Sequence, residues 1–283
     1  MAPLALGSQT NGSMIRPAAF CGVYGVKPSH GLISRGGVLM LSRALDHVGV
    51  FARSLPDAAL LLDVLAGYDP LDPDTRPVAS PAFHKTCGEE PPLRPSFAFV
   101  RTPIWEKADA GTREAFEEFA AELGESAVST DLPEGYAAAW DDQRAIMAAD
   151  MAHYLNAFVA EDDESSSQTL RDFMAEGREV TAVRYLAARD AARRYAAGIS
   201  EIFKYHEAII TPATRGVAPK GIGATGDPAF CSLWTLTGLP AITLPLLTGD
   251  DGMPLGVQLI GAAGDDARLM RTANWLVRHL TDD

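Results

Sequence analysis

A run of small residues close to the start of the chain constrains it most. Residues 7–22 read G-S-Q-T-N-G-S-M-I-R-P-A-A-F-C-G, and the apolar segment 3–6 comes immediately before them. The pattern predicts a short buried strand, a tight loop and then a helix, because Pro17 is tolerated in a first helical turn. The first N–H groups of such a helix have no partners within the helix and can bind an anion.

Ser13 in this loop has two interpretations. A serine hydroxyl becomes a nucleophile when a neighbouring base activates it. Backbone N–H groups of Thr10, Asn11 and Gly12 would then stabilise the oxyanion that forms. Alternatively, Ser13 is an ordinary helix cap in a Gly/Ser/Asn turn. The run by itself leaves both interpretations open.

Longer segments at both ends of the chain carry a family resemblance. They read V-Y-G-V-K-P-S-H-G-L-I-S-R-G-G (23–37), D-H-V-G-V-F-A-R-S-L-P-D-A-A-L-L-L (46–62), T-G-D-P-A-F-C-S-L-W-T-L-T-G-L-P-A-I-T-L-P (225–245) and G-M-P-L-G-V-Q-L-I-G (252–261). With residues 7–22 they resemble the amidase signature family, serine hydrolases that cleave carboxylic amides with a Ser–cis-Ser–Lys triad. The resemblance implies that Ser13 is the nucleophile of an acyl-enzyme and that Thr10, Asn11 and Gly12 form the oxyanion hole.

Strands alternate with helices along the chain, which indicates an α/β layer fold. Strands are predicted over 3–6, 23–26, 47–52, 97–100, 208–210, 241–244 and 256–260, and helices over 54–67, 112–123, 137–158, 170–174, 182–203, 228–238 and 265–280, with a charged break over 161–167. The resemblance implies a mixed, twisted central sheet with helices on both faces, from which the N-terminal part of the family fold is missing. We interpret 1–283 as one domain whose helical region 112–203 shapes the substrate pocket.

The run differs from the commonest family pattern at three places. Gln9 stands where Asp is frequent, the arginine is shifted by one position to Arg16, and Asn11 replaces a glycine. If position 11 needs a positive φ, Asn is the best-tolerated side chain after Gly. If the peptide passes close to the substrate, the added side chain crowds it.

The two other members of the family triad lie upstream of the nucleophile, and here only twelve residues precede Ser13, none of them Lys. The chain is therefore expected to be an amidase whose activity is impaired, with Met1 in the place of an internal methionine. A non-catalytic remnant or one half of a split protein is the alternative. An amidotransferase subunit that acts on charged tRNA shares the signature, but the acidic charge argues against it.

Other groups in the chain could replace the missing base. Lys27 falls on G-V-K-P, where the family carries a structural lysine in addition to its catalytic one. His30 and His47, the latter beside Asp46, could form a Ser–His pair, although such histidines are usually surface or structural residues. Asp227 could contact substrate, but a helix cap explains it. Three further side chains could line a pocket or pack in the core: Trp140, Met147 and Met151.

Net charge and cysteine spacing limit the classes of partner and the compartment that we expect for this chain. The formal net charge is −13, which disfavours nucleic acid and acidic membranes, and no segment approaches the length of a membrane helix. Cys21, Cys87 and Cys231 have neither disulfide-framework nor metal-ligand spacing, so the cytoplasm is the expected compartment. We expect a small-molecule amide substrate, no metal and no cofactor. Loss of neighbouring strands predicts self-association, such as a homodimer.

Overall fold

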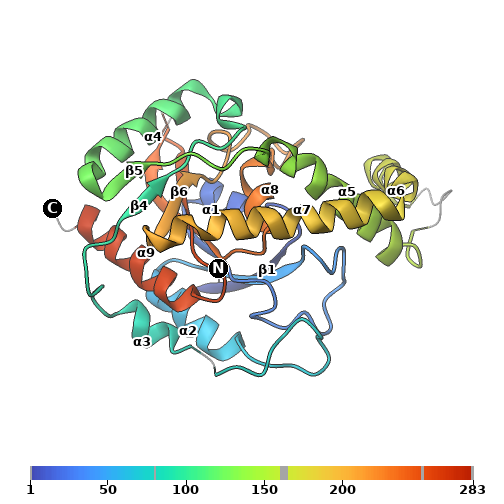
Figure 1. Ribbon diagram of the computed structural model, residues 1–283, viewed down its shortest axis with the longest axis horizontal. Coiled ribbons are helices and arrows are strands. Elements are labelled where there is room, and N and C mark those ends of the chain that lie inside the picture. The colour runs from blue at the N-terminus through green and yellow to red at the C-terminus, as the bar shows by residue number, and fades with distance from the viewer. Residues whose placement is uncertain (1, 80, 160–164, 250–251, 282–283) are drawn as a thin grey trace.

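One mixed sheet organises the chain, and its computed structural model describes residues 2–79, 81–159, 165–249 and 252–281 (Figure 1). The sheet has eight strands in the order β1-β3-β2-β7-β8-β6-β4-β5. All neighbours are antiparallel except β4, which runs parallel to β6 and β5. The strands are β1 (Leu4–Gln9), β2 (Tyr24–Lys27), β3 (His47–Ala52), β4 (Phe97–Phe99), β5 (Ala127–Ser129), β6 (Ala208–Pro212), β7 (Ala241–Thr248) and β8 (Pro254–Ile260).

Helices cover both faces of this sheet. They are α1 (Ile15–Cys21), α2 (Leu55–Leu65), α3 (Phe83–Cys87), α4 (Ala110–Leu123), α5 (Ala139–Tyr154), α6 (Gln168–Glu179), α7 (Ala182–Ser200), α8 (Ala229–Leu236) and α9 (Asp266–Thr281), with 3-10 turns at Trp105–Lys107, Gly124–Ser126, Tyr136–Ala138 and Ile202–Lys204. Successive residues of a strand point to opposite faces. Accordingly, Ile210 packs in the core with α2, α3, α4 and α9, whereas Ile209 packs in the core with α1, α5, α7 and α8.

The α/β fold with helices on both sheet faces is confirmed. One element inside the predicted helical region 112–203 is different: β5 is a strand that extends the sheet beside β4. Its three residues are too few to show an alternating pattern, so the sequence did not indicate it. The predicted break over 161–167 lies partly outside the described residues, at 160–164.

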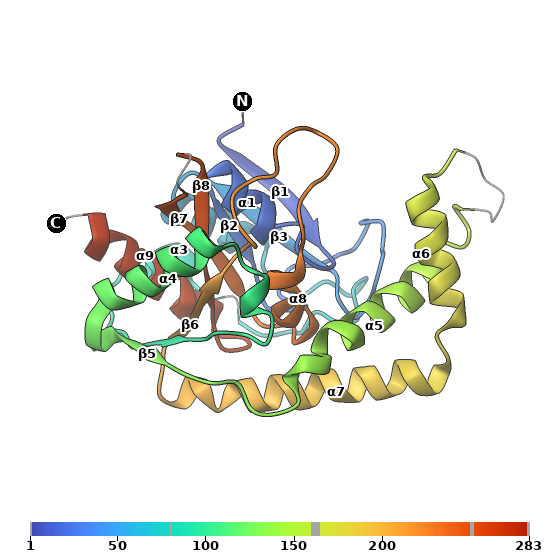
Figure 2. The same cartoon turned by 90° about the horizontal axis from the view of Figure 1, so that it is seen from above.

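Helices α5, α6 and α7 form an arm that leaves the body of the molecule. Figure 2 shows α5 leading away from the strands to α6, and α7 returning alongside α5. The side chain of Tyr185 on α7 donates a hydrogen bond to Asp150 Oδ1 on α5 at 2.9 Å. A part-buried hydrogen bond therefore joins the two longer helices of the arm.

Strand β1 forms one edge of the sheet. It pairs with β3 along its whole length, from Leu4 opposite Ala52 to Gln9 opposite His47, and no other described strand pairs with it. Leu6 on this strand is 57% exposed. An open strand edge with an exposed apolar side chain can pair with another chain, so self-association stays a prediction. No helix in the described ranges is long and apolar enough to cross a bilayer.

Candidate active site

Ser13 lies in the tight turn between β1 and α1. Its side chain is exposed, and its hydroxyl makes no hydrogen bond to any residue that the structure describes. Helix α1 begins two residues later, and Pro17 occupies its first turn as predicted. No side chain caps α1 from the N-cap position. Ser13 is thus not the helix cap that its position also allowed.

Gln9, at the end of β1, binds the start of α1 instead. Its Oε1 accepts hydrogen bonds from the N–H groups of Met14 at 2.8 Å and Ile15 at 3.0 Å. Its Nε2 donates to Thr235 Oγ1 at 2.8 Å, and the whole side chain is buried. Gln9 therefore satisfies two of the N–H groups that a helix start leaves unpaired, and it ties this turn to α8.

The N–H groups of Asn11, Gly12 and Ser13 differ from those bound by Gln9. Within the described ranges none of the three donates a hydrogen bond. Consecutive free N–H groups in a turn form a concave site for an anion or a developing oxyanion. We call residues 10–13, which include the predicted nucleophile Ser13, the nucleophile loop.

Helix α8 holds one side of the nucleophile loop. Thr235 Oγ1 donates to the carbonyl oxygen of Asn11 at 2.5 Å, and Ser232 Oγ donates to Asn11 Oδ1 at 2.7 Å. A Cβ atom on Gly12 would lie 2.8 Å from Pro228 Cβ, closer than van der Waals contact allows. Glycine is therefore needed at position 12 for the loop to approach the start of α8.

Position 11 does not have the positive φ that would favour glycine or asparagine there. Every described residue with a positive φ is a glycine, so Asn11 does not adopt the left-handed conformation. Its side chain instead faces Ser232 and accepts the hydrogen bond from that hydroxyl. The asparagine thus adds an anchor between the loop and α8 that a glycine would lack.

Lys27 is fully buried at the end of β2. Its Nζ donates to the carbonyl oxygens of Leu239 at 2.5 Å and Pro28 at 3.2 Å, and it makes no hydrogen bond to Ser13. Burial lowers the pKa of the Lys27 ammonium to about 7, and the nearby Asp266 carboxylate partly opposes that shift. The contact to Leu239 joins the end of β2 to the segment just before β7, which fits the structural role given to Lys27.

The two candidate histidines contact each other rather than Ser13. The rings of His30 and His47 lie 5.2 Å apart in an edge-to-face arrangement. His47 is buried, its Nδ1 lies 2.6 Å from the carbonyl oxygen of Leu45, and its Nε2 has no partner in the described ranges. Burial lowers the pKa of both rings, and Lys27 and Arg35 add to this by repulsion. Neither imidazole forms the Ser–His pair that was considered.

Comparison with known proteins identifies the family of the chain. The family model described as Amidase matches residues 1–270. The chain belongs to the amidase signature family. The fold of the chain is also that of a solved relative, a chain from a vestigial protein complex that reveals the evolutionary origins of an s-triazine catabolic enzyme. The two chains superpose with a TM-score of 0.88 at 27% identity, over 98% of this chain and 63% of that one.

Other members of the amidase signature family have different named functions. The A subunit of glutamyl-tRNA(Gln) amidotransferase from Thermus thermophilus is 34% identical over 306 residues, which cover 96% of this chain and 64% of that protein. The 6-aminohexanoate cyclic dimer hydrolase has a TM-score of 0.82 and 27% identity, over 99% of this chain and 65% of that one. Peptide amidase from Stenotrophomonas maltophilia has a TM-score of 0.79 and 26% identity, over 99% and 62%. The chain thus spans less than two thirds of each.

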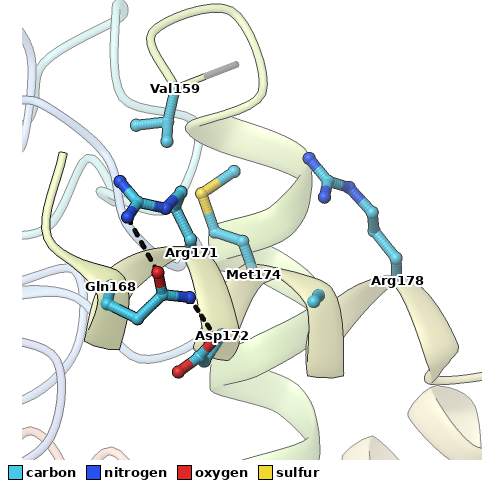
Figure 3. Close-up of a pocket in the computed structure, with 7 residues that line it drawn as sticks. Val159, Gln168, Arg171, Asp172, Met174 and Arg178 are labelled. Carbon is cyan, nitrogen blue, oxygen red and sulfur yellow. Dashed lines mark hydrogen bonds between the residues drawn. The ribbon is translucent and has the colours of Figure 1, made fainter. Parts of the chain in front are cut away.

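Two surface cavities of this amidase-family chain lie on the helical arm, away from the nucleophile loop. One, of about 430 Å³, is lined by residues of α6 and by Val159 (Figure 3). There Arg171 donates to Gln168, and Gln168 donates to Asp172. The other, of about 400 Å³, lies between α5, α6 and the start of α7. Neither cavity includes Ser13 among its lining residues, and no cluster suited to a metal ion occurs in the described part of the chain.

The remaining candidates have structural contacts. Asp227 Oδ1 accepts a hydrogen bond from Ala229 N at 2.9 Å, so it binds the first N–H group of α8, although Pro228 is the N-cap residue of that helix. Trp140 Nε1 donates to the carbonyl oxygen of Ala229 at 2.8 Å. The three side chains that could have lined a pocket are half-buried and pack against the apolar core: Trp140, Met147 and Met151.

Three residues that contact the amidase nucleophile loop were not predicted to do so. They are Asp46, Ser232 and Thr235, which hydrogen-bond to Thr10 and Asn11. All three lie within the segments that carry the family resemblance, which is the only signal the sequence offers for them. The distance along the chain, up to 224 residues, hides such pairs from any local pattern.

Proposed function

We propose that the chain carries the nucleophile of an amide hydrolase and that Ser13 forms its acyl-enzyme. The hydroxyl oxygen attacks the amide carbonyl carbon while its proton passes to a base. The resulting oxyanion is stabilised by N–H groups of the nucleophile loop, with Thr10, Asn11 and Gly12 as the residues assigned to this role. Collapse breaks the C–N bond, ammonia or an amine leaves with a proton, and water then releases the acid.

One observation carries this proposal: the exposed Ser13 hydroxyl adjoins N–H groups that no described residue binds, in a loop held from several sides. Preorganised donors next to a nucleophile are the main requirement for acyl transfer. A merely structural turn would normally have its buried N–H groups paired. The three cysteines of the described chain are free thiols, in line with a cytoplasmic enzyme.

The base is proposed to act from sequence other than these 283 residues, as the family triad implies. We therefore expect no labelling of the purified chain by a fluorophosphonate probe above the level of Ser13→Ala. Such probes phosphonylate a serine only when a base activates it. Mass spectrometry of the labelled protein measures this directly. Rapid, Ser13-dependent labelling would show that a base within the chain reaches the hydroxyl.

The Ser13→Cys variant tests whether the nucleophile loop stabilises an oxyanion, and it does so without that base. A thiol has enough thiolate near pH 8 to react unaided. Transfer of an acetyl group from p-nitrophenyl acetate forms a tetrahedral oxyanion and expels p-nitrophenolate, whereas alkylation by iodoacetamide displaces iodide and forms none. The ratio of the acylation rate to the alkylation rate therefore reports on oxyanion stabilisation, because both rates depend on thiolate and access.

We expect this ratio to be about 100-fold higher for the thiol introduced by Ser13→Cys than for Cys21, since one oxyanion donor is worth that much or more. Cys21 is the internal reference, because it is an exposed free thiol at the other end of α1. Peptide mass spectrometry separates the two sites, and Cys87 and Cys231 are buried. Equal ratios for the introduced thiol and Cys21 would refute the proposed function.

A second candidate function comes from the curated relatives. The protein from Thermus thermophilus is named as the A subunit of glutamyl-tRNA(Gln) amidotransferase. If this chain had the same role, its acyl-enzyme would release ammonia for transfer rather than as a product. Its net charge of −13 opposes binding of a polyanion. Binding of glutamyl-tRNA to the chain in a low-salt gel shift would favour this role over simple hydrolysis.

A further inference from the structure

The nucleophile loop contacts a second element besides α8. Because the N–H groups of Asn11, Gly12 and Ser13 are unpaired within the described ranges, they do not fix the loop's conformation. The hydroxyl of Thr10 donates to Asp46 Oδ1 at 2.7 Å, and both side chains are buried. The loop is therefore held between α8 and the turn that leads into β3.

Asp46 is itself held rigidly. Its Oδ2 accepts hydrogen bonds from the N–H groups of Leu41 at 2.8 Å and Ser42 at 3.0 Å, and its own N–H donates to the carbonyl oxygen of Ser42 at 2.8 Å. The carboxylate thus closes a tight turn over residues 41–46 with one oxygen. Its other oxygen is left for Thr10, and hydrogen bonds to an ionised acceptor are roughly twice as strong as neutral ones.

The turn is also joined to the helical arm. Ser42 Oγ donates to Asp150 Oδ2 on α5 at 2.5 Å, and Tyr185 on α7 donates to the other oxygen of Asp150 at 2.9 Å. A continuous path of hydrogen bonds therefore runs from α7 through Asp150, Ser42 and Asp46 to Thr10. Connected hydrogen bonds of this kind strengthen one another and restrict their members to one arrangement.

We propose that Asp46 is a positioning residue for amide cleavage: its carboxylate, fixed by the 41–46 turn, holds Thr10 and so aims the free N–H groups of the nucleophile loop at the oxyanion. Asp46 touches no reacting atom and acts only through Thr10. This role rests on the proposed function, because it concerns the same oxyanion site. It also gives the Thr10 hydroxyl a function in the loop.

The test compares four substitutions in the Ser13→Cys chain by the acylation-to-alkylation ratio. Asp46→Ala removes all three hydrogen bonds that the carboxylate accepts. Asp46→Asn keeps its amide oxygen on the two N–H groups of the turn and offers its NH₂ to Thr10, whose hydroxyl can accept as well as donate. Thr10→Val removes only the contact to the loop. Asp57→Ala is the matched control. The Asp57 carboxylate, like that of Asp46, accepts a hydrogen bond from a hydroxyl group, that of Ser54 at 2.7 Å, but it lies on α2.

We expect Asp46→Ala to lower the ratio of the introduced thiol by about 100-fold, the loss typical of a displacement of about 1 Å in an active site. Thr10→Val is expected to give a loss of similar size without disturbing the 41–46 turn, so it serves if Asp46→Ala folds poorly. Asp46→Asn is expected to recover the ratio to within a few-fold of the parent, and Asp57→Ala to leave it unchanged. A simple structural role would lower stability in Asp46→Ala without this pattern.

Two negative outcomes are distinct. If the introduced thiol of the parent Ser13→Cys chain acylates no faster than Cys21 relative to alkylation, the proposed function fails and the positioning role fails with it. If the parent shows the enhancement but Thr10→Val and Asp46→Ala retain it, only the positioning role of Asp46 is wrong. Thermal unfolding of each variant confirms that the ratios are measured on folded protein.

Discussion

Arg35→Met is expected to lower the free energy of unfolding by about 3–5 kcal/mol, because it leaves a buried carboxylate without its cation. The Arg35 guanidinium binds Asp72 through two hydrogen bonds, of 2.8 and 2.9 Å, and also contacts Asp74 at 2.5 Å. The side chains of Arg35 and Asp72 are only 2% and 3% exposed. Water therefore cannot replace the lost partner.

Arg43→Met is the matched control for this prediction. Arg43 also binds Asp74, at 2.9 Å, but its side chain is 49% exposed. Exposed ion pairs contribute about 0–1 kcal/mol, so this variant should unfold close to the parent in urea. If both variants lost the same free energy of unfolding, burial of the ion pair would not be the cause of the loss.

The loss in Arg35→Met should also depend on pH. The Arg35 guanidinium lowers the pKa of Asp72 below its usual value of 3.8, so this pair stabilises the parent above that pH and less as pH falls. Without the cation, only the backbone N–H groups of Arg35 and Asp74 still bind the Asp72 carboxylate and oppose the effect of burial, so the charged carboxylate stabilises the variant less than the parent at neutral pH. The gap between parent and variant should thus be largest near neutral pH and shrink as the pH falls below the usual carboxyl pKa of 3.8. A constant gap would indicate lost packing rather than lost charge.

Lys27→Met is expected to change how stability varies with alkaline pH. The folded pKa of Lys27, about 7, lies below its usual value of 10.5. Between these values the unfolded chain binds more protons, so the parent gains stability as pH rises through this window. At about 1.4 kcal/mol per pH unit, the parent should gain on the order of 2–3 kcal/mol relative to Lys27→Met between about pH 7 and about pH 9.

Urea unfolding at several pH values across this window measures the difference. Lys220→Met is the control, since Lys220 is exposed and its ammonium stays in water in both states. Lys27→Met also leaves two buried carbonyl oxygens, of Leu239 and Pro28, without their donor. That cost is the same at every pH, so the change with pH is the decisive quantity. Parallel curves for parent and variant would show that Lys27 is charged throughout.

Local sequence patterns predicted most of the fold. The predicted strand 47–52 is β3 itself, and Ser54 caps α2 as its position before Pro56 and Asp57 indicated. Strand β1 runs further than predicted, to Gln9, because residues 7–9 look like loop residues but pair with β3. Pairing partners, rather than propensity, set that boundary.

The site was predicted only in part for a related reason. The run 7–22 indicates a small-residue loop before a helix, and the structure has that arrangement around Ser13. The residues that hold the loop are Asp46, Ser232 and Thr235, and each looks ordinary in its own segment. Their importance arises from contacts between distant parts of the chain, which no periodicity encodes. The roles assigned to Ser13 and the oxyanion donors stay predictions.

The hydroxyl of Thr235 touches both Gln9 and Asn11, so the loop around Ser13 depends on a residue that follows Asn11 by 224 positions. Chains are synthesised from the N-terminus at roughly 5–20 residues per second. A ribosome-bound chain that has just completed α7 therefore has its serine but not yet the residue that shapes the loop around it. The nucleophile loop is thus made well before α8 and reaches its final form only after α8 has been made.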